Sequence, residues 1–339
     1  MKAIPVEQAV GTVLCHDITQ IVPGKFKGRA FKRGHIISNT DVPKLLSLGK
    51  EHIYVFDLND GFVHEDDAAK RMAKAAKGEH LSLSSVCEGR INLHAEIDGL
   101  LKINTDALFE INSEEEIVFA TIHGNQAVTV GRQVAGTRVV PLAVVNEKVE
   151  RVENICANYG PIVTIKPFRP LQVGVVTTGS EVYHGRIKDA FGPILKKKFE
   201  KMGCSILRQA FVPDDTSMAI DAVRSLLEEG ADMIALTGGM SVDPDDQTPS
   251  AIRALGADVV TYGAPTFPGA MFMLAYLGDI PVMGLPGCVM YSKASIFDLV
   301  APRLVAGETV TRRDIIGLGH GGLCAGCETC RYPICGFGK

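Results

Sequence analysis

Two hydrophobic patterns divide the chain near residue 170. Before this point, short apolar runs alternate with turns rich in Gly, Asp and Asn. After it, apolar runs of strand length alternate with amphipathic helical segments, two of which end at a glycine. Alternating strands and helices specify a doubly wound, mostly parallel α/β sheet. We therefore predict an α/β domain from residue 170 onwards, preceded by smaller α+β and β-rich subdomains.

The second half of the chain has enough strands for one open sheet. Its predicted strands span residues 173–177, 206–212, 231–236, 258–261, 271–277 and 280–284. Its predicted helices span residues 189–202, 218–229 and 291–305, and a further helix ends at 252–255. In open α/β sheets, ligands bind beyond the carboxyl ends of the strands. Binding residues should therefore lie just after a strand.

The first half is predicted to form two smaller parts. Its predicted strands span residues 9–14, 35–37, 52–56, 91–97, 117–123 and 127–130, and its helices span 41–48, 65–77 and 147–157. A hinge is expected at 168–170, before the pattern changes. We predict an N-terminal α/β subdomain (1–77), a β-rich subdomain (78–169), the α/β domain (170–308) and a tail (309–339).

Composition and charge indicate which kinds of molecule the protein is not expected to bind. The formal net charge is −4 over 339 residues, so no general basic surface is available for nucleic acid. No apolar run reaches the roughly 18 residues of a membrane-spanning helix, and the start lacks a signal peptide. We therefore expect a cytoplasmic protein without nucleic-acid or membrane partners.

A local cluster of basic residues is the exception to the weak overall charge. Two readings remain open for it, a solvated hairpin and an anion site. The cluster comprises Lys25, Lys27, Arg29, Lys32 and Arg33.

The loop at 237–246 follows an apolar strand and has the residue types of an active-site loop. Gly238 and Gly239 let the backbone turn tightly and approach a ligand, and the hydroxyls of Thr237 and Ser241 suit phosphate or sugar oxygens. Three carboxylates follow within four positions, at Asp243, Asp245 and Asp246. A shared Mg²⁺ would relieve their repulsion. The alternative is a solvated turn that caps the helix beginning near Thr248.

Four other loops repeat this pattern after predicted strands. Hydroxyls and backbone N–H groups at helix N-termini can cradle an anion, whereas Glu181, Asp214 and Asp246 suit a metal ion or a base. No P-loop or dinucleotide fingerprint is present. We therefore expect a phosphorylated ligand. The loops contain Thr177, Thr178, Gly179, Ser180 and Glu181; Asp214 and Asp215; Pro268 and Gly269; and Pro286 and Gly287.

These loops resemble the molybdopterin-binding domain of molybdenum cofactor biosynthesis, in particular the MoeA-type molybdopterin molybdotransferases. The resemblance covers about residues 170–308 and is loose before that. It implies that the strand-end loops bind the phosphate and pterin of molybdopterin. It also implies that Glu181, Asp214 and Asp246 serve catalysis or metal binding, and that the protein is a homodimer.

Several positions depart from the family's pattern. A lysine is expected after Pro268-Gly269, but Ala270 and Met271 stand there, and Cys288 and Val289 replace the asparagine and proline after Gly287. Two hypotheses remain open. The first is an enzyme that transfers molybdate to molybdopterin or adenylylated molybdopterin, with Mg²⁺ held by Asp246 and Asp243. The second is a non-catalytic carrier that delivers the cofactor to a molybdoenzyme.

The tail predicts a separate metal site. Four of the nine cysteines, Cys324, Cys327, Cys330 and Cys335, lie within a dozen residues, where a β-domain would follow in the molybdotransferases. Four thiolates at such spacing can bind one zinc ion or an iron–sulfur cluster. Zinc, a cluster, and a tail that is unmetallated or disulfide-bonded all remain open.

Overall fold

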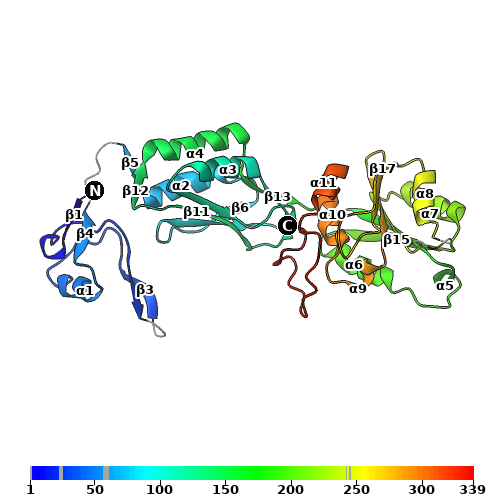
Figure 1. The fold of residues 1–339 in the computed structure, drawn as a ribbon, viewed down its shortest axis with the longest axis horizontal. Helices are drawn as coiled ribbons and strands as arrows, with labels where there is room; N and C mark the ends of the chain where they lie inside the picture. The colour runs from blue at the N-terminus through cyan, green and yellow to red at the C-terminus, as the bar shows by residue number, and fades with distance from the viewer. Residues whose placement is uncertain (1, 23–25, 56–60, 242, 244–245) are drawn as a thin grey trace. The chain divides into compact units, whose positions relative to one another are not determined.

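The described residues pack into two units (Figure 1). The computed structural model describes residues 2–22, 26–55, 61–241, 243 and 246–339. Unit 1 comprises Met1–His94, Ile103–Ile122 and Gln133–Thr164, and unit 2 comprises Ala95–Lys102, His123–Arg132 and Ile165–Lys339. The four-part division expected from the sequence stays a prediction; its β-rich subdomain (78–169) contributes residues to both units.

Unit 2 is built on a six-stranded sheet in the order β15-β14-β16-β19-β18-β17. Pairing is parallel between β14 and β15, β14 and β16, and β16 and β19, and antiparallel on both sides of β18. The predicted doubly wound, mostly parallel sheet is therefore confirmed. The strands are β14 (Gln172–Thr178), β15 (Ser205–Val212), β16 (Met233–Thr237), β17 (Asp258–Tyr262), β18 (Met273–Leu277) and β19 (Ile280–Leu285).

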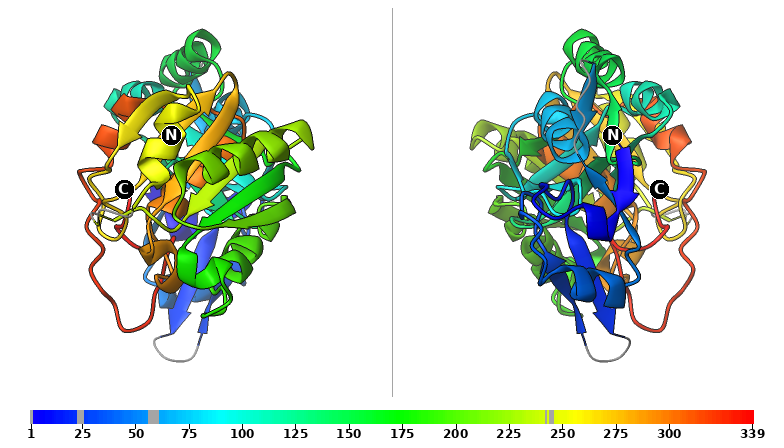
Figure 2. Two further views of the ribbon diagram at one scale, coloured as in Figure 1. Left: turned by 90° about the vertical axis from the view of Figure 1, so that its right-hand side faces the viewer. Right: turned by 90° about the vertical axis from the view of Figure 1, so that its left-hand side faces the viewer.

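Helices cover both faces of this sheet because successive strand residues point to opposite sides (Figure 2). Val173 and Val175 of β14 pack on one face with α6 (Phe191–Glu200), α10 (Ile296–Val305) and α11 (Arg312–Gly317). Val176 packs on the other face with α7 (Thr216–Glu228) and α8 (Thr248–Ala254). Two buried layers therefore hold the sheet, as the near-continuous apolar strands require.

The direction of the strands brings five loops to one edge of the sheet. Strands β14, β15, β16 and β19 run parallel, and β17 runs in the same direction because two antiparallel pairings separate it from β19. Their carboxyl ends therefore share one edge. We call the loops that leave this edge the strand-end loops; they begin after Thr178, Val212, Thr237, Tyr262 and Leu285.

The helix predicted over 291–305 is wrong in its first turn. The structure has a short helix α9 (Cys288–Tyr291), a break, and then α10 from Ile296. Ser295 starts the new helix through a capping box, in which Ser295 and the carboxylate of Asp298 satisfy each other's backbone N–H groups. The cap outweighs the continuous apolar pattern from which the single helix was predicted.

Unit 1 combines small sheets with helices. Its four-stranded sheet has the order β6-β7-β11-β9, and three two-stranded pairings join β1 to β4, β2 to β3, and β5 to β12. The strands are β1 (Lys2–Pro5), β2 (Ile18–Val22), β3 (Phe26–Phe31), β4 (His52–Val55), β5 (Phe62–His64), β6 (Leu81–Leu83), β7 (Arg90–Ala95), β9 (Ile117–Thr121), β11 (Gln133–Val139) and β12 (Ala143–Val145). The helices of unit 1 are η1 (Val6–Gln8), α1 (Val42–Ser47), α2 (Glu65–Ala76), α3 (Thr105–Ser113) and α4 (Asn146–Tyr159). Helix α5 (Ser180–Tyr183) belongs to unit 2.

Two predicted strands are absent from unit 1, and one helix was not predicted. Residues 9–14 and 35–37 do not form strands; they make turns and an isolated bridge from Val13 to Ile36, because Gly11 turns the chain at φ 84°. Helix α3 was not expected, although Asn104 caps its start by accepting a hydrogen bond from the N–H of Ala107. An Asn cap is a weak signal on its own.

A second, smaller sheet lies mostly in unit 2. It has the order β10-β8-β13, with β8 (Gly99–Ile103), β10 (Gln126–Val128) and β13 (Val163–Pro167). Across the described residues, no helix has the length and apolar character needed to cross a bilayer.

Candidate functional site

A layer of buried hydroxyls lies beneath the strand-end loops. The Thr237 hydroxyl donates to Thr177 Oγ1 at 3.1 Å, and Thr178 Oγ1 lies 3.2 Å from Thr248 Oγ1. Thr248 in turn donates to the carbonyl of Gly238 at 2.8 Å. All four threonines are buried, with at most 6% of their surface exposed. Because buried polar groups must be paired, these hydroxyls fix the loops relative to one another.

Gly238 and Gly239 allow the closest approach in this layer. Gly238 has φ 83°, and a Cβ at this position would lie 2.1 Å from the carbonyl oxygen of Thr178. Gly239 has φ 52° and lies against the hydroxyls of Thr178 and Thr248. Only glycine adopts such a conformation without strain and leaves room for the neighbouring strand. The tight turn predicted from the sequence is therefore required by the packing.

The amide of Gln209 joins β15 to this layer and was not expected from the sequence. Its Nε2 donates to Thr177 Oγ1 and to Asp189 Oδ2, both at 2.8 Å. Asp189 also accepts from the N–H groups of Phe191 and Gly192 at the start of α6. A polar residue on an edge strand carries little sequence signal, because such positions often face solvent.

The neighbouring carboxylates Asp214 and Asp215 have different contacts. Asp214 accepts a hydrogen bond of 2.9 Å from the N–H of Ser180 and so ties two strand-end loops together. Asp215 caps α7 through the N–H of Met218, and the Ser217 hydroxyl holds the pKa of this carboxyl below its usual value. Glu181 is exposed at the start of α5. Asp214 and Glu181 therefore keep carboxylate oxygens available beside Ser180.

The carboxylate of Asp246 turns back onto its own loop. Its Oδ2 accepts from the N–H of Asp243 at 3.1 Å, and the N–H of Asp246 donates to the Asp243 carbonyl at 3.0 Å. Ser241 and Asp243 are exposed. Asp245, the third acid of this loop, lies outside the described residues, as does Lys25 of the basic cluster.

The last two strand-end loops meet at the start of α10. The N–H of Ile296 donates to the Pro268 carbonyl at 3.2 Å, and a Cβ on Gly269 would lie 2.5 Å from Ile296 Cβ. Pro286 is buried at the end of β19, whereas Gly287 is exposed and has open space around it. Contact with a ligand stays a prediction for every residue of the strand-end loops.

Comparison with known protein families identifies this part of the chain. A family model described as "Probable molybdopterin binding domain" matches residues 174–306, and a model described as a domain of unknown function matches residues 3–57. Residues 174–306 form a divergent domain of the molybdopterin-binding family. The strand-end loops and the hydroxyl layer all belong to this domain or lie at its border.

Curated relatives match about two fifths of this chain. The molybdopterin molybdenumtransferase of Staphylococcus aureus (strain COL) is 28% identical over 140 residues, which are 39% of this chain and 33% of that protein. The same enzyme of Synechococcus elongatus is 25% identical over 152 residues, which are 42% of this chain and 38% of that protein. The chain therefore spans about a third of the length of the curated relatives it matches.

Solved structures of similar fold include the tungsten cofactor synthesizing protein MoaB from Pyrococcus furiosus. It is 21% identical, with a TM-score of 0.33, and the match covers 42% of this chain and 94% of that one. A molybdopterin biosynthesis Mog protein from Mycobacterium ulcerans is likewise 21% identical, with a TM-score of 0.31, covering 40% and 92% of the two chains.

The cysteine-rich tail docks onto the loop that carries Pro268. The N–H of Phe267 donates to the Gly322 carbonyl and the N–H of Cys324 donates to the Phe267 carbonyl, each at 2.8 Å. Phe337 is buried beside Leu299 of α10, and Cys324 and Cys335 pack against the same apolar cluster. Cys327 and Cys330 are exposed. No group of three or more His, Cys, Asp or Glu side chains is arranged to hold a metal ion in the described ranges.

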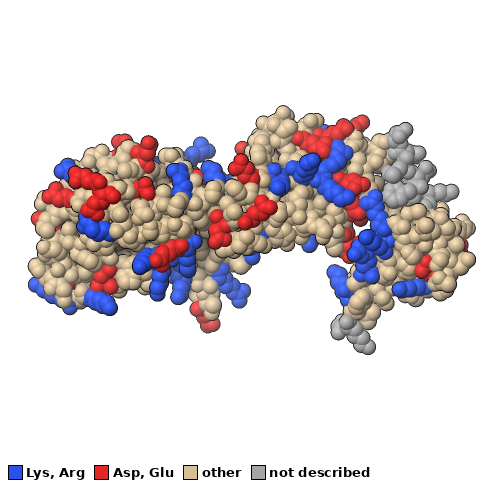
Figure 3. Space-filling view, turned by 180° about the vertical axis from the view of Figure 1, so that it is seen from behind, with Lys and Arg blue, Asp and Glu red and all other residues tan. Residues whose placement is uncertain are grey.

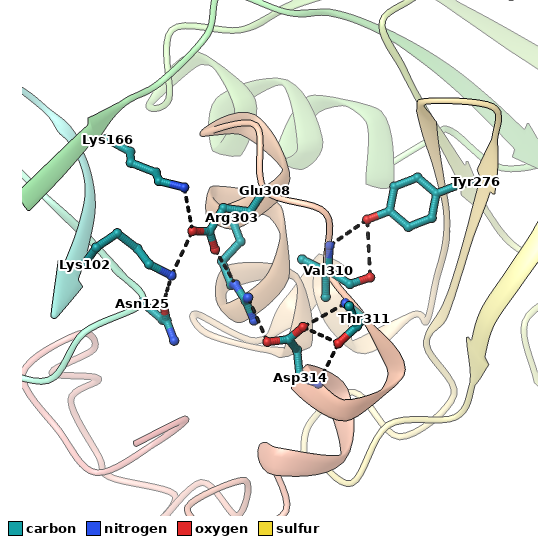
Figure 4. Close-up of polar contacts among 9 residues, drawn as sticks. All are labelled: Lys102, Asn125, Lys166, Tyr276, Arg303, Glu308, Val310, Thr311 and Asp314. Carbon is teal, nitrogen blue, oxygen red and sulfur yellow. Dashed lines mark hydrogen bonds and ion pairs between the residues drawn. The ribbon is translucent and has the colours of Figure 1, made fainter. Parts of the chain in front are cut away.

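A cluster of charged side chains in unit 2 forms ion pairs among its own members (Figure 4). Glu308 accepts from Lys102 at 2.8 Å, from Lys166 at 3.1 Å and from Arg303 at 2.9 Å, and Arg303 also binds Asp314 at 2.9 Å. Burial alone would raise the pKa of Glu308, but these three cations outweigh it and lower the pKa to about 2. Every charge of this Glu308 cluster has a partner within it, so the arrangement is that of a structural tie.

Proposed function

We propose that the family domain binds molybdopterin or adenylylated molybdopterin at the strand-end loops, and that the protein acts as a molybdotransferase on this ligand. The observation that carries the proposal is the meeting of five loops with hydroxyl, glycine and acidic residues at one edge of a sheet of this family. Curated relatives of this domain are named molybdopterin molybdenumtransferases, which supports the reaction class.

The residues divide into two groups by their exposure. The buried threonines and Gly238 hold the loops in place, while the exposed or half-buried Ser180, Ser241 and Gly287 are free to approach the phosphate and pterin of the ligand. Backbone N–H groups at helix starts and hydroxyls are suitable partners for phosphate oxygens. Glu181 and Asp214 supply carboxylates for proton transfer or for orienting the reacting groups.

The carboxylate oxygens of Asp243 and Asp246 form a donor set that fits Mg²⁺, which prefers oxygen ligands. Both residues lie in one loop, and Asp243 is exposed, so a cation can reach it from solvent. When bound, Mg²⁺ would draw negative charge from phosphate oxygens. Asp246 would also keep the loop closed through the N–H of Asp243.

Two measurements test the proposal. Mass spectrometry of purified protein should find a co-purified pterin phosphate, and the protein should convert adenylylated molybdopterin and molybdate into loaded cofactor. Asp246→Asn should lower turnover at least about a hundredfold, the magnitude typical of removing one stabilising group. Asp221→Asn, on the exposed side of α7, is the matched control and should leave turnover unchanged. Full turnover by Asp246→Asn would exclude a catalytic role for this residue.

A carrier that delivers finished cofactor to a molybdoenzyme is the second candidate. The observation that favours it is the replacement of the lysine expected after Gly269 by Ala270, because a charge-assisted contact in the anion pocket is lost. Protein that binds the pterin but never converts adenylylated ligand and molybdate would select the carrier. Protein that turns over the ligand would exclude it.

We also propose that the tail binds one zinc ion or an iron–sulfur cluster through Cys324, Cys327, Cys330 and Cys335. Thiolates are the preferred donors for both, and Cys324 and Cys335 already pack against one cluster of side chains. Metal analysis of anaerobic protein should find about one zinc per chain or a visible-absorbing cluster. Replacing Cys327 and Cys330 with Ser should remove it. Absence of both metals from reduced, anaerobic protein would contradict the proposal.

The assembly is proposed from the resemblance alone. We expect a homodimer in which the basic cluster around Lys27 and Arg29 contributes to the contact with the partner subunit. Sedimentation that shows only monomer at micromolar concentration would contradict it. Localisation in the cytoplasm likewise stays a prediction.

A further inference from the structure

Unit 1 contains a cavity of about 450 Å³, and none of its lining residues belongs to the strand-end loops. Its wall includes His16, Thr19, Lys27, Lys50 and Tyr54, which come from β2, β3, β4 and the segments beside them. Thr19 and Ile21 are two positions apart in β2 and therefore point to the same face of the hairpin. Lys27 of β3 pairs with Ile21 on that face, which lines the cavity. A volume of this size accommodates a small metabolite.

The acidic residues of the wall are already engaged. Asp17 accepts from the Arg29 guanidinium at 2.7 Å and from the N–H of Arg33 at 2.8 Å. Glu88 accepts from the Thr19 hydroxyl at 2.6 Å. Glu65 lies 3.6 Å from the guanidinium of Arg138. Asp17 and Glu65 are therefore paired with guanidinium groups, whereas Glu88 has a neutral hydroxyl partner and keeps its negative charge.

The lysines of the wall, by contrast, have no such partners. Within the described part of the chain, the ammonium groups of Lys27 and Lys50 have no ion-pair or hydrogen-bond partner, and neither has the Tyr54 hydroxyl. Lys and Arg side chains gather on this part of unit 1, at the right of the view in Figure 3. The wall therefore offers unused donors and positive charge.

His16 adds a buried and unsatisfied group. Its Nδ1 is shielded from solvent and makes no hydrogen bond in the described structure. Burial and then the charge of Lys50 lower the pKa of His16, and both residues line the cavity. Because Nδ1 is closed to solvent, it is not one of the donors that face the cavity, and the His16 ring serves as a reporter on the cavity wall.

We propose that this cavity binds a small metabolite through its phosphate group, held by Lys27 and Lys50. Lysines act as point charges on phosphate, and two ammonium groups from separate elements match a dianion better than a single negative charge. The hydroxyl of Tyr54 is a further donor on the same wall. The site is independent of the strand-end loops, because all of its residues belong to unit 1.

Titration of the full-length protein with inorganic phosphate tests the proposal. The double variant Lys27→Gln/Lys50→Gln should weaken binding at this site at least tenfold. The matched control Lys74→Gln/Lys77→Gln removes the same charge from exposed positions of unit 1 outside the cavity and should bind as the wild type does. Equal affinities of the two double variants would overturn the proposal.

A site-specific signal separates this cavity from any phosphate bound at the strand-end loops. The ring resonance of His16, identified by its loss in His16→Gln, should shift as phosphate is added and should not shift in the Lys27→Gln/Lys50→Gln variant. A resonance that stays in place in the wild type would overturn the proposal. Succinate serves as a dicarboxylate probe, and binding as tight as that of phosphate would overturn the assignment to a phosphate group.

Discussion

The strand-end loops and the Glu308 cluster are two polar regions of the same unit with opposite organisation. Beneath the strand-end loops, neutral hydroxyls pair with one another in the interior, while the acids Glu181 and Asp243 remain exposed. In the Glu308 cluster, charged groups pair with one another, and the central carboxylate is only 9% exposed. Neutral pairs hold the first region and charge pairs hold the second.

This difference separates polar groups that can still bind a ligand from polar groups whose contacts only stabilise the fold. A charge whose partners are already in place gains little from a ligand, because binding would have to replace contacts that exist. Charges left at a loop surface above a rigid, neutral layer can bind a ligand without that loss. The comparison therefore favours the strand-end loops as the functional site, although the Glu308 cluster contains more charged contacts.

The largest effect is expected when the hydroxyl layer is broken at Gly238. Gly238→Ala places a Cβ 2.1 Å from the Thr178 carbonyl at φ 83°, so strain and steric overlap should destabilise unit 2 by about 3 kcal/mol. Chemical denaturation measures the change. Gly287→Ala is the matched control, because Gly287 has φ −53° and open space around it, and its stability should not change. Equal stabilities of the two variants would contradict the role given to Gly238.

The next effect should come from the centre of the Glu308 cluster. Glu308→Gln leaves Lys102 and Lys166 without their anion and Arg303 with Asp314 alone. It should cost about 2 kcal/mol, below the range for fully buried pairs because Lys166 is partly solvated. Pterin binding should persist. Glu229→Gln breaks the exposed pair with Arg208 and should leave stability almost unchanged, because solvent screens the pair. A Glu308→Gln variant as stable as Glu229→Gln would show that the cluster is not a tie.

Acid should weaken the same cluster in a defined pH window. The folded-state pKa of Glu308, about 2, is lower than its ordinary value of 4.5, so its contribution is present above about pH 4.5 and is lost as the pH falls toward 2. The stability difference between wild type and Glu308→Gln should therefore shrink across this interval. Unfolding measured at several pH values tests it. A difference that stays constant down to pH 2 would contradict the assignment.

The smallest effect is expected for a single hydroxyl of the layer. Thr248→Val removes the donor to the Gly238 carbonyl and the contact with Thr178, and should cost about 1 kcal/mol. Thr248→Ser keeps the hydroxyl and should restore most of this stability. A valine variant as stable as the serine variant would show that the hydroxyl contributes nothing. Denaturation curves of both variants decide the question.

Several features could be predicted from the sequence because they depend on neighbouring residues. Strands β14, β16 and β19 are near-continuous apolar runs, and loops with glycine and hydroxyl residues follow them directly. The fold class and the order of the loops therefore follow from local periodicity. The break before α10 was missed because the cap by Ser295 and Asp298 opposes an apolar pattern that continues through it.

Other features were beyond the sequence because they depend on which strands lie side by side. Thr177 meets Thr237 and Gln209 only because β14 lies between β15 and β16, and nothing near Gln209 indicates this role. The cavity beside His16 likewise combines side chains from the start of the chain and from Arg138. Its unpaired lysines stand out only once the partners of the surrounding acids are known.

The sequence by itself determined the doubly wound sheet and the five loops at its carboxyl edge, because hydrophobic alternation and turn residues act within a few positions. Only the tertiary structure decided which polar groups already have partners and which remain able to bind a ligand. Thr177 and Thr178 are suited to a ligand by type, but both are buried; Thr177 accepts from Gln209 and Thr237, and Thr178 pairs with Thr248. Glu308 is neutralised by Lys102 and Lys166, which lie more than 140 positions away along the chain. Charge and hydrogen bonding act through space, so their balance is set by packing.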